Sequence, residues 1–290
     1  MPPTLLDREE YVEQAYFYRV FRERLAENMP AQEILERIHE EILSTTRLPL
    51  AIQYLATELK HTGELAPGYA RLPHYFTPFQ TFVIRQAEAQ NQRFTMTTAL
   101  LVLEREAHYR ANQPTRPGLF VYQFETISRN RLGYDEGITA MAGDPFYDAD
   151  WVKFLEMVRR QVGVIDFADF IYGRSEQMVI EERRHHPDYT PALPPLFGEK
   201  EGKIAKASRG RDPLFLFAAL QRQLGYPEVP RPQRADDSTA QLVALTTKLR
   251  ELESRLRLVE GELKGQVDLS QFGKPELLRD DDDQNRYTIE

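Results

Sequence analysis

The chain has 290 residues, of which 41% are hydrophobic and 11% aromatic, so it contains enough apolar material to bury one sizeable core. Its formal net charge of −8 argues against a main role in coating nucleic acid or an anionic membrane, because both tasks depend on surplus lysine and arginine. The lack of cysteine excludes disulfides, thiolate zinc sites and cysteine nucleophiles.

The opening segment, MPPTLLDREE, carries acidic residues where a secretory signal would carry a positive end followed by an apolar stretch. The longest apolar run, Leu214 to Leu220, is far shorter than the roughly 20 residues that a membrane span needs. We therefore expect a soluble cytoplasmic protein without a membrane partner.

Helix-start signals recur along the first part of the chain. Asp7 with Glu10, and Thr77 with Gln80, have the form of capping boxes, in which each of two side chains binds a free backbone N–H. Several of the apolar runs that follow such signals have helical spacing, and strand-like alternation is scarce. The pattern predicts an all-α protein with one multi-helix globular domain over residues 1–225.

About nine or ten helices are expected in this domain. They include helices over residues 95–109, 150–162 and 166–185. The segment Leu119–Ile127 alternates as a strand would, but it also fits a helix. Because no second strand is available to pair with it, we predict a helix there.

The chain changes character after Gly225, a residue that favours the end of a helix. The proline-rich residues 226–237 predict a semi-stiff linker. A further helix is then expected over residues 238–264, where Ser238 and Gln241 form another capping box.

Apolar residues in this last helix alternate spacings of three and four, which is the heptad seam of a coiled coil. The seam consists of Leu242, Leu245, Leu249, Leu252, Leu256, Val259 and Leu263. In a parallel pair Lys248 would face Glu253, and Arg255 would face Glu260, so the charges favour a parallel homodimer. Two alternatives to a homodimer stay open. The helix could pair with a different protein, or it could dock on the chain's own domain, although a docked helix usually has a wider apolar stripe.

Residues 265–290 read as a flexible acidic tail, because glycines and proline interrupt it and Asp280–Asp283 repel one another. Four apolar residues within the tail indicate either a docking segment for an unidentified protein partner or a segment that packs on its own domain. They are Leu269, Phe272, Leu277 and Leu278.

The spacing Glu-x-x-His, which carboxylate-bridged metal sites in helical bundles use, occurs three times. Only Glu182 and His185 align with the apolar face of their helix, so they are weak metal candidates. We expect no cofactor. Asp144, Asp148 and Asp150 lack the pattern of a calcium loop, and an N-cap at Asp148 or Asp150 explains them better.

A basic loop is predicted over residues 198–211, either as a solvated connector or as a face that binds RNA, a phosphorylated ligand or the acidic tail of another molecule. Its basic residues are Lys200, Lys203, Lys206, Arg209 and Arg211. Neither the glycine spacing nor the residue after Lys203 fits a nucleotide P-loop.

No catalytic constellation stands out in the sequence, and whether the protein is an enzyme stays open. The favoured hypothesis is a non-enzymatic interaction or scaffold protein that self-associates through the coiled coil and binds a protein partner through its tail. The alternatives are a helical-bundle enzyme or small-ligand binder, with or without a carboxylate–histidine metal, and a nucleic-acid accessory protein that uses the basic loop.

Overall fold

The computed structural model describes residues 5–89 and 94–231, together with Thr246, Lys248 and Leu256. These residues form thirteen α-helices and no strand, which confirms the predicted all-α class. Within this part of the chain, no helix has the length and apolarity to traverse a lipid bilayer. The helices are α1 Arg8–Ala26, α2 Ala31–Ile38, α3 Leu48–Thr62, α4 Ala66–Arg71, α5 Pro78–Glu88, α6 Met96–Ala111, α7 Arg116–Asn130, α8 Tyr134–Ala142, α9 Ala149–Gln161, α10 Phe167–Gly173, α11 Glu176–His185, α12 Glu199–Ser208 and α13 Pro213–Leu224.

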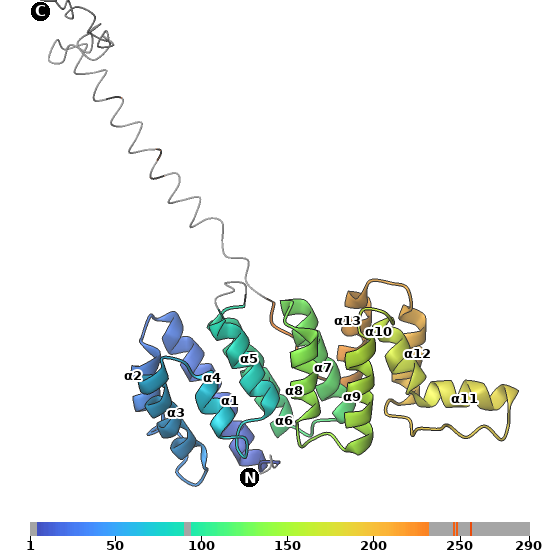
Figure 1. The fold of residues 1–290 in the computed structure, drawn as a ribbon, viewed down its shortest axis with the longest axis horizontal. Coiled ribbons are helices and arrows are strands. Elements are labelled where there is room, and N and C mark those ends of the chain that lie inside the picture. Colours follow the sequence, from blue (N-terminus) through green and yellow to red (C-terminus); the bar gives the residue numbers. More distant parts are fainter. Residues whose placement is uncertain (1–4, 90–93, 232–245, 247, 249–255, 257–290) are drawn as a thin grey trace, which may run out of the picture. The chain divides into compact units, whose positions relative to one another are not determined.

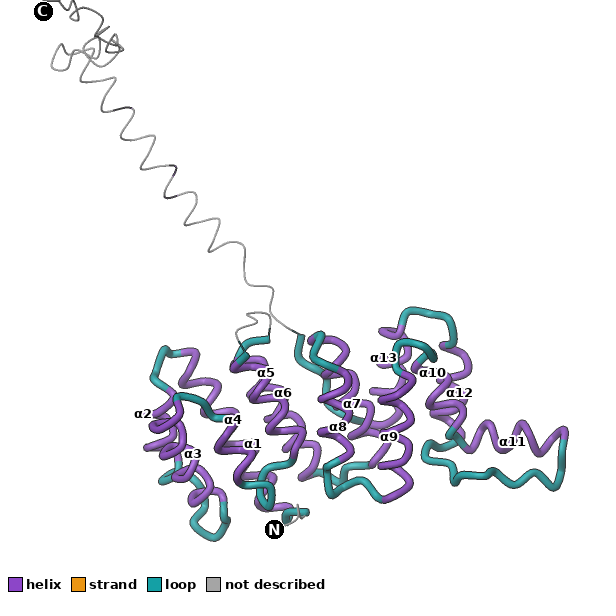
Figure 2. The backbone as a smooth tube through the Cα atoms, viewed as in Figure 1, coloured by secondary structure: helices purple, strands orange, loops and turns teal. Residues whose placement is uncertain are grey.

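The helices of the domain pack in two rows (Figure 1). One row runs through α3, α4, α5, α8 and α9, and the other through α2, α1, α6, α7, α13 and α12. Helix α11 and the segment that follows it project from the end of the array (Figure 2). Because α5 packs directly against α8, residues that are far apart in sequence share one face of the domain.

Local sequence explains where several helices begin. The Thr77 hydroxyl accepts a hydrogen bond from the Gln80 backbone N–H at 3.2 Å, and the Gln80 side chain accepts one from the Thr77 N–H at 3.0 Å. The predicted capping box of α5 is thereby confirmed, with Pro78 at the first helical position. At the start of α13, the Asp212 carboxylate accepts from the Leu214 N–H at 2.9 Å.

The capping box predicted for Asp7 and Glu10 is wrong. The Asp7 side chain makes no cap hydrogen bond. The Glu10 carboxylate instead accepts hydrogen bonds from the Arg47 backbone N–H at 2.9 Å and from the Tyr75 hydroxyl at 2.7 Å. Glu10 is buried, and a buried carboxylate is stabilised by donors from neighbouring elements rather than by its own helix end.

The expected number of helices was too low, and the helix predicted over residues 166–185 is divided into α10 and α11. At the break, the Ser175 hydroxyl accepts from the Met178 N–H at 3.3 Å and caps α11. The Arg174 guanidinium donates to the carbonyl of Pro194 at 3.0 Å. The segment between α11 and α12, which contains Pro194, therefore contacts the break between α10 and α11. Sequence periodicity does not reveal such a contact.

Other helix predictions are confirmed. The helices expected over residues 95–109 and 150–162 are α6 and α9, with ends that differ by at most two residues. The ambiguous segment Leu119–Ile127 lies inside α7 and is buried throughout. Asp148 caps α9 by accepting from the backbone N–H groups of Asp150 and Trp151, so the predicted N-cap in this group of aspartates is confirmed at Asp148.

The core at the α7 and α9 end of the domain is aromatic. The ring of Phe120 on α7 lies 5.5 Å from Trp151 and 5.3 Å from Phe154 on α9, measured between ring centroids. Phe197, just before α12, lies 5.9 Å from the same ring. These side chains are all buried, so the cluster ties α7, α9 and the start of α12 together.

The domain extends beyond the predicted boundary at residue 225. Tyr226 and Val229 are each only 2% exposed. The Tyr226 hydroxyl donates to the Glu125 carboxylate on α7 at 2.7 Å. The first part of the predicted linker 226–237 is therefore packed on the domain through its apolar residues, and the rest of that linker lies outside the described residues.

Candidate functional site

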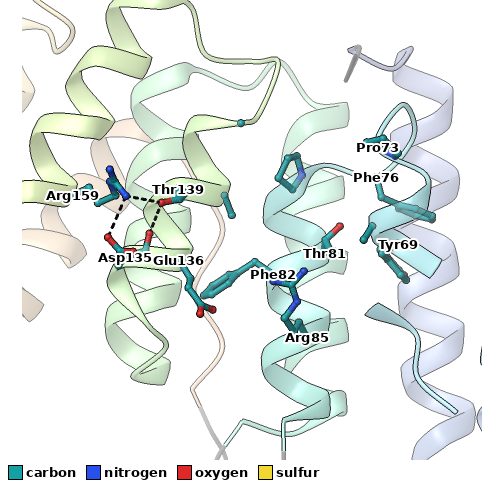
Figure 3. A pocket seen from close by; sticks show the side chains of 14 residues that line it. Tyr69, Pro73, Phe76, Thr81, Phe82, Arg85, Asp135, Glu136, Thr139 and Arg159 are labelled. Atoms are coloured by element: carbon teal, nitrogen blue, oxygen red, sulfur yellow. Dashed lines mark hydrogen bonds and ion pairs between the residues drawn. The ribbon is translucent and has the colours of Figure 1, made fainter. Parts of the chain in front are cut away.

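A groove lies on the face of the domain formed by α4, α5, α8 and α9 (Figure 3). Its volume is about 610 Å³, within the range of roughly 300–1,000 Å³ that is usual for small-molecule sites. We call it the aromatic groove. The side chains labelled along it are Tyr69, Pro73, Phe76, Thr81, Phe82, Arg85, Asp135, Glu136, Thr139 and Arg159.

A glycine allows α8 to approach its neighbours at this face. A Cβ atom at Gly137 would lie 2.6 Å from Cδ1 of Ile127 on α7 and 3.1 Å from the ring of Phe82 on α5. Distances this short are strongly repulsive, so any larger residue would push α8 outward. The separation of α5 and α8, and with it the shape of the groove, therefore depends on Gly137.

The two sides of the aromatic groove differ in chemistry (Figure 3). Tyr69, Phe76 and Phe82 line it from α4, the following segment and α5. On the opposite side, the Arg159 guanidinium donates to the Asp135 carboxylate at 3.3 Å and to the Thr139 hydroxyl at 3.4 Å. The three rings are buried and lie behind the floor of the groove, where Pro73 and Pro78 are partly exposed. The arrangement suits an amphipathic ligand, with an apolar part against this floor and a polar part toward α8 and α9.

Arg85 on α5 is the second cation of the groove, and it forms no ion pair with any residue that the structure describes. Glu136 of α8 accepts a hydrogen bond from the Gln86 side chain at 3.4 Å. Because Arg159 is already paired with Asp135, Arg85 is the cation most available to an anionic group in the groove.

A cluster of charged side chains is buried in the core next to α6. Glu106 and Arg110 come from α6, and Asp144 follows α8; they are 0%, 5% and 2% exposed, respectively. Arg110 Nε and Nη2 donate to Glu106 Oε1 at 3.0 and 2.6 Å, and Arg110 also donates to Asp144. The Gln123 amide donates to Glu106 Oε1 at 3.0 Å, and the Tyr147 hydroxyl donates to Gln123 at 2.9 Å.

This cluster contains two carboxylates and one guanidinium. Burial raises the pKa of Glu106, and the charge of Asp144 raises it further, while Arg110 acts in the opposite direction. Burial alone would lower the pKa of Arg110, but the charges of Asp144 and Glu106 outweigh it and raise that pKa. Closed to solvent, the cluster joins α6 to the α8–α9 junction and is a structural feature rather than an open site.

The weak metal candidates, Glu182 and His185, lie in the last turn of α11, where both side chains are exposed. No third ligand joins them in the described part of the chain. More generally, those residues contain no group of three or more His, Asp or Glu side chains placed to hold a metal ion.

The predicted basic loop over residues 198–211 is largely helical, because α12 occupies its centre. Gly202 permits close contact with the start of α11, since a Cβ there would lie 2.3 Å from the Ser175 hydroxyl oxygen. Ala205 is also buried. One face of α12 is therefore buried against its neighbours, which the many lysines in this segment do not predict.

Three of the five basic residues in this segment are paired with carboxylates. Lys203 pairs with Glu199, Lys206 with Glu181 and Arg209 with Asp169. Lys200 and Arg211 have no ion pair with described residues. The paired charges reduce the positive potential that a bound polyanion would meet.

The predicted heptad seam lies outside the described residues except for Leu256. That leucine is helical and 60% exposed. The four predicted tail residues, Leu269, Phe272, Leu277 and Leu278, also lie outside the described part. Pairing through the seam and docking through the tail therefore stay predictions.

Sequence reasoning missed the aromatic groove, whose polar residues come from separate helices. Arg85 and Arg159 are far apart in sequence and share no motif. Glu106 and Arg110 have the i, i+4 spacing of an ion pair, but the same spacing is common on solvent-exposed helix surfaces. Gly137 within a helix is a local signal of close packing between α8 and its neighbours.

Comparison with known proteins found no matching family model, no matching curated protein and no matching solved structure.

Proposed function

We propose that this protein is a non-enzymatic interaction protein whose helical domains are paired by a parallel coiled coil over residues 242–263. The apolar tail residues between Leu269 and Leu278 would bind a protein partner. The observation that carries the proposal is the unbroken heptad seam, which is narrow and flanked by charged residues.

Exposure of Leu256, the seam residue that the structure describes, supports pairing. Leu256 occupies an a position and is helical, and 60% of its surface is open to solvent in a single chain. Burial of a leucine side chain contributes about 1.5–3 kcal/mol. A second helix that covered the whole seam would therefore gain substantial hydrophobic stabilisation.

Charged changes in the seam test the pairing directly. The full chain is expected to have twice the mass of one chain by light scattering. Leu249→Asp combined with Leu256→Asp should give a monomer, because each carboxylate would have to be buried between the helices.

A matched control adds the same charge outside the seam. Thr247→Asp combined with Ser254→Asp changes two f positions, which face away from a partner helix, and should leave the dimer intact. A monomeric parent chain would refute the pairing, and so would a dimer that survives the seam changes.

Charge exchange tests the parallel orientation. Lys248→Glu with Arg255→Glu, and separately Glu253→Lys with Glu260→Lys, would place like charges opposite one another in each homodimer. Each variant alone should pair weakly, and the mixture should form a heterodimer. Equally weak pairing in the mixture would contradict the parallel arrangement.

A second candidate function, small-ligand binding, is favoured by the size and chemistry of the aromatic groove. Anilinonaphthalene sulfonate is a suitable probe because it combines aromatic rings with an anionic group that Arg85 can pair with. Its fluorescence should rise several-fold on binding to the parent chain.

The matched variants are two alanine-to-tryptophan changes. Ala140→Trp fills the aromatic groove, whereas Ala207→Trp lies on the exposed side of α12. The probe should lose its fluorescence increase with Ala140→Trp and keep it with Ala207→Trp. Equal fluorescence for both variants would rule out the groove as the binding site.

The third hypothesis, nucleic-acid binding through residues 198–211, receives less support. Carboxylates already pair with Lys203, Lys206 and Arg209, so fewer cations are available to phosphate groups.

A further inference from the structure

A second concave site lies between α1, the start of α6 and residues 228–231. Its volume is about 450 Å³. Three arginines line it, Arg22 from α1, Arg105 from α6 and Arg231 from the end of the domain. We call it the arginine pocket.

The arginines are only partly neutralised. Both Nε and Nη2 of Arg22 donate to a single oxygen of Glu104, at 3.2 and 3.0 Å. Arg105 donates to the carbonyl oxygen of Glu228 and lies 4.0 Å from the carboxylate of the same residue. Arg231 is exposed and forms no ion pair with the residues that the structure describes. Three cations therefore face two carboxylates, in a chain whose formal net charge is −8.

Unused donors remain at the pocket. A guanidinium has five N–H donors, and the contacts of Arg22 and Arg105 occupy only some of them. Thr97 is an exposed lining residue that adds a hydroxyl group. A planar guanidinium donates two parallel hydrogen bonds to a phosphate, and several arginines around one concave site can hold several phosphate oxygens at once.

The remaining lining gives the pocket an apolar wall. Leu101 of α6 is half-buried and lies beside the arginines, and the buried Val229 lies behind the surface of the pocket. The volume exceeds what a single phosphate ion requires and lies within the range of small-molecule sites. We propose that the arginine pocket binds a phosphorylated small molecule, with its phosphate on Arg22, Arg105 and Arg231 and its less polar part against Leu101.

The test is calorimetric titration of the full chain with inorganic pyrophosphate at low ionic strength. Binding is expected, and Arg231→Gln should weaken it by about tenfold, the usual effect of losing a charge-assisted contact. Arg231 is exposed and makes no described ion pair, so its substitution should leave the fold intact. Arg222→Gln removes an exposed arginine from α13 and should leave affinity unchanged.

Arg105→Gln provides a second test, and it should weaken binding at least as much as Arg231→Gln. Citrate serves as the carboxylate probe. Stronger binding of pyrophosphate than of citrate supports the phosphate assignment, and equal or tighter binding of citrate overturns it. No heat of binding from the parent chain, or equal affinity in the parent and Arg231→Gln, would refute the proposal.

Discussion

Replacement of Arg110 by methionine is expected to lower the free energy of unfolding by about 3–5 kcal/mol, the usual cost of breaking a buried ion pair. Glu106 and Asp144 would lose the guanidinium that lies between them. Neither carboxylate is exposed, so water cannot replace the lost donors. Urea unfolding followed by circular dichroism measures the change.

The cost of this substitution should depend on pH. Burial raises the pKa of Glu106 in the folded protein, and loss of the Arg110 charge would raise it further. A raised folded-state pKa means that the folded protein binds more protons than the unfolded chain. The loss should therefore be smallest below about pH 3, where the Glu106 carboxyl is protonated in both states, and grow as the pH rises.

Two further variants separate charge from packing. Adding Glu106→Gln and Asp144→Asn to Arg110→Met removes the unpaired charges and should recover part of the stability. Arg159→Met removes a partly exposed ion pair with Asp135 and should cost no more than about 1 kcal/mol. If Arg110→Met cost as little as Arg159→Met, the buried cluster would not stabilise the fold as we describe.

Phe120→Ala is the second substitution with a large expected effect, a loss of about 3–5 kcal/mol. Phe120 is fully buried. Its ring contacts Trp151 and Phe154 of α9, Phe167 of α10 and Phe197 before α12. Removal of the ring leaves a cavity among elements that it now joins, and the surrounding side chains can fill that cavity only in part.

The single tryptophan of the chain reports on this cluster, because the Trp151 ring lies 5.5 Å from that of Phe120. Its fluorescence should change in the folded variant as well as on unfolding. Phe215→Ala is the matched control, since that side chain is 69% exposed. The control should change stability by less than about 0.5 kcal/mol, and equal losses from both substitutions would contradict the assignment of Phe120 to the centre of the core.

Local chemistry in the sequence was sufficient to predict the class of fold and many helix starts. Thr77 and Gln80 cap their helix because both partners lie within one turn, so the geometry is complete before any tertiary contact forms. The same reasoning failed for Glu10, whose carboxylate accepts hydrogen bonds from Arg47 and Tyr75 in segments between other helices. A residue pattern read locally cannot distinguish these cases when the competing partner is distant in sequence.

Sequence by itself also determined the heptad prediction, because a seam depends only on spacing along one helix. Only the tertiary structure decided where the aromatic groove and the arginine pocket lie, and that Glu106, Arg110 and Asp144 are buried. The groove needs α5 beside α8, and the pocket needs residues 228–231 folded back onto α1 and α6. Sites of this kind arise from helix packing, in which burial and the meeting of distant side chains are properties of the whole domain rather than of any one segment.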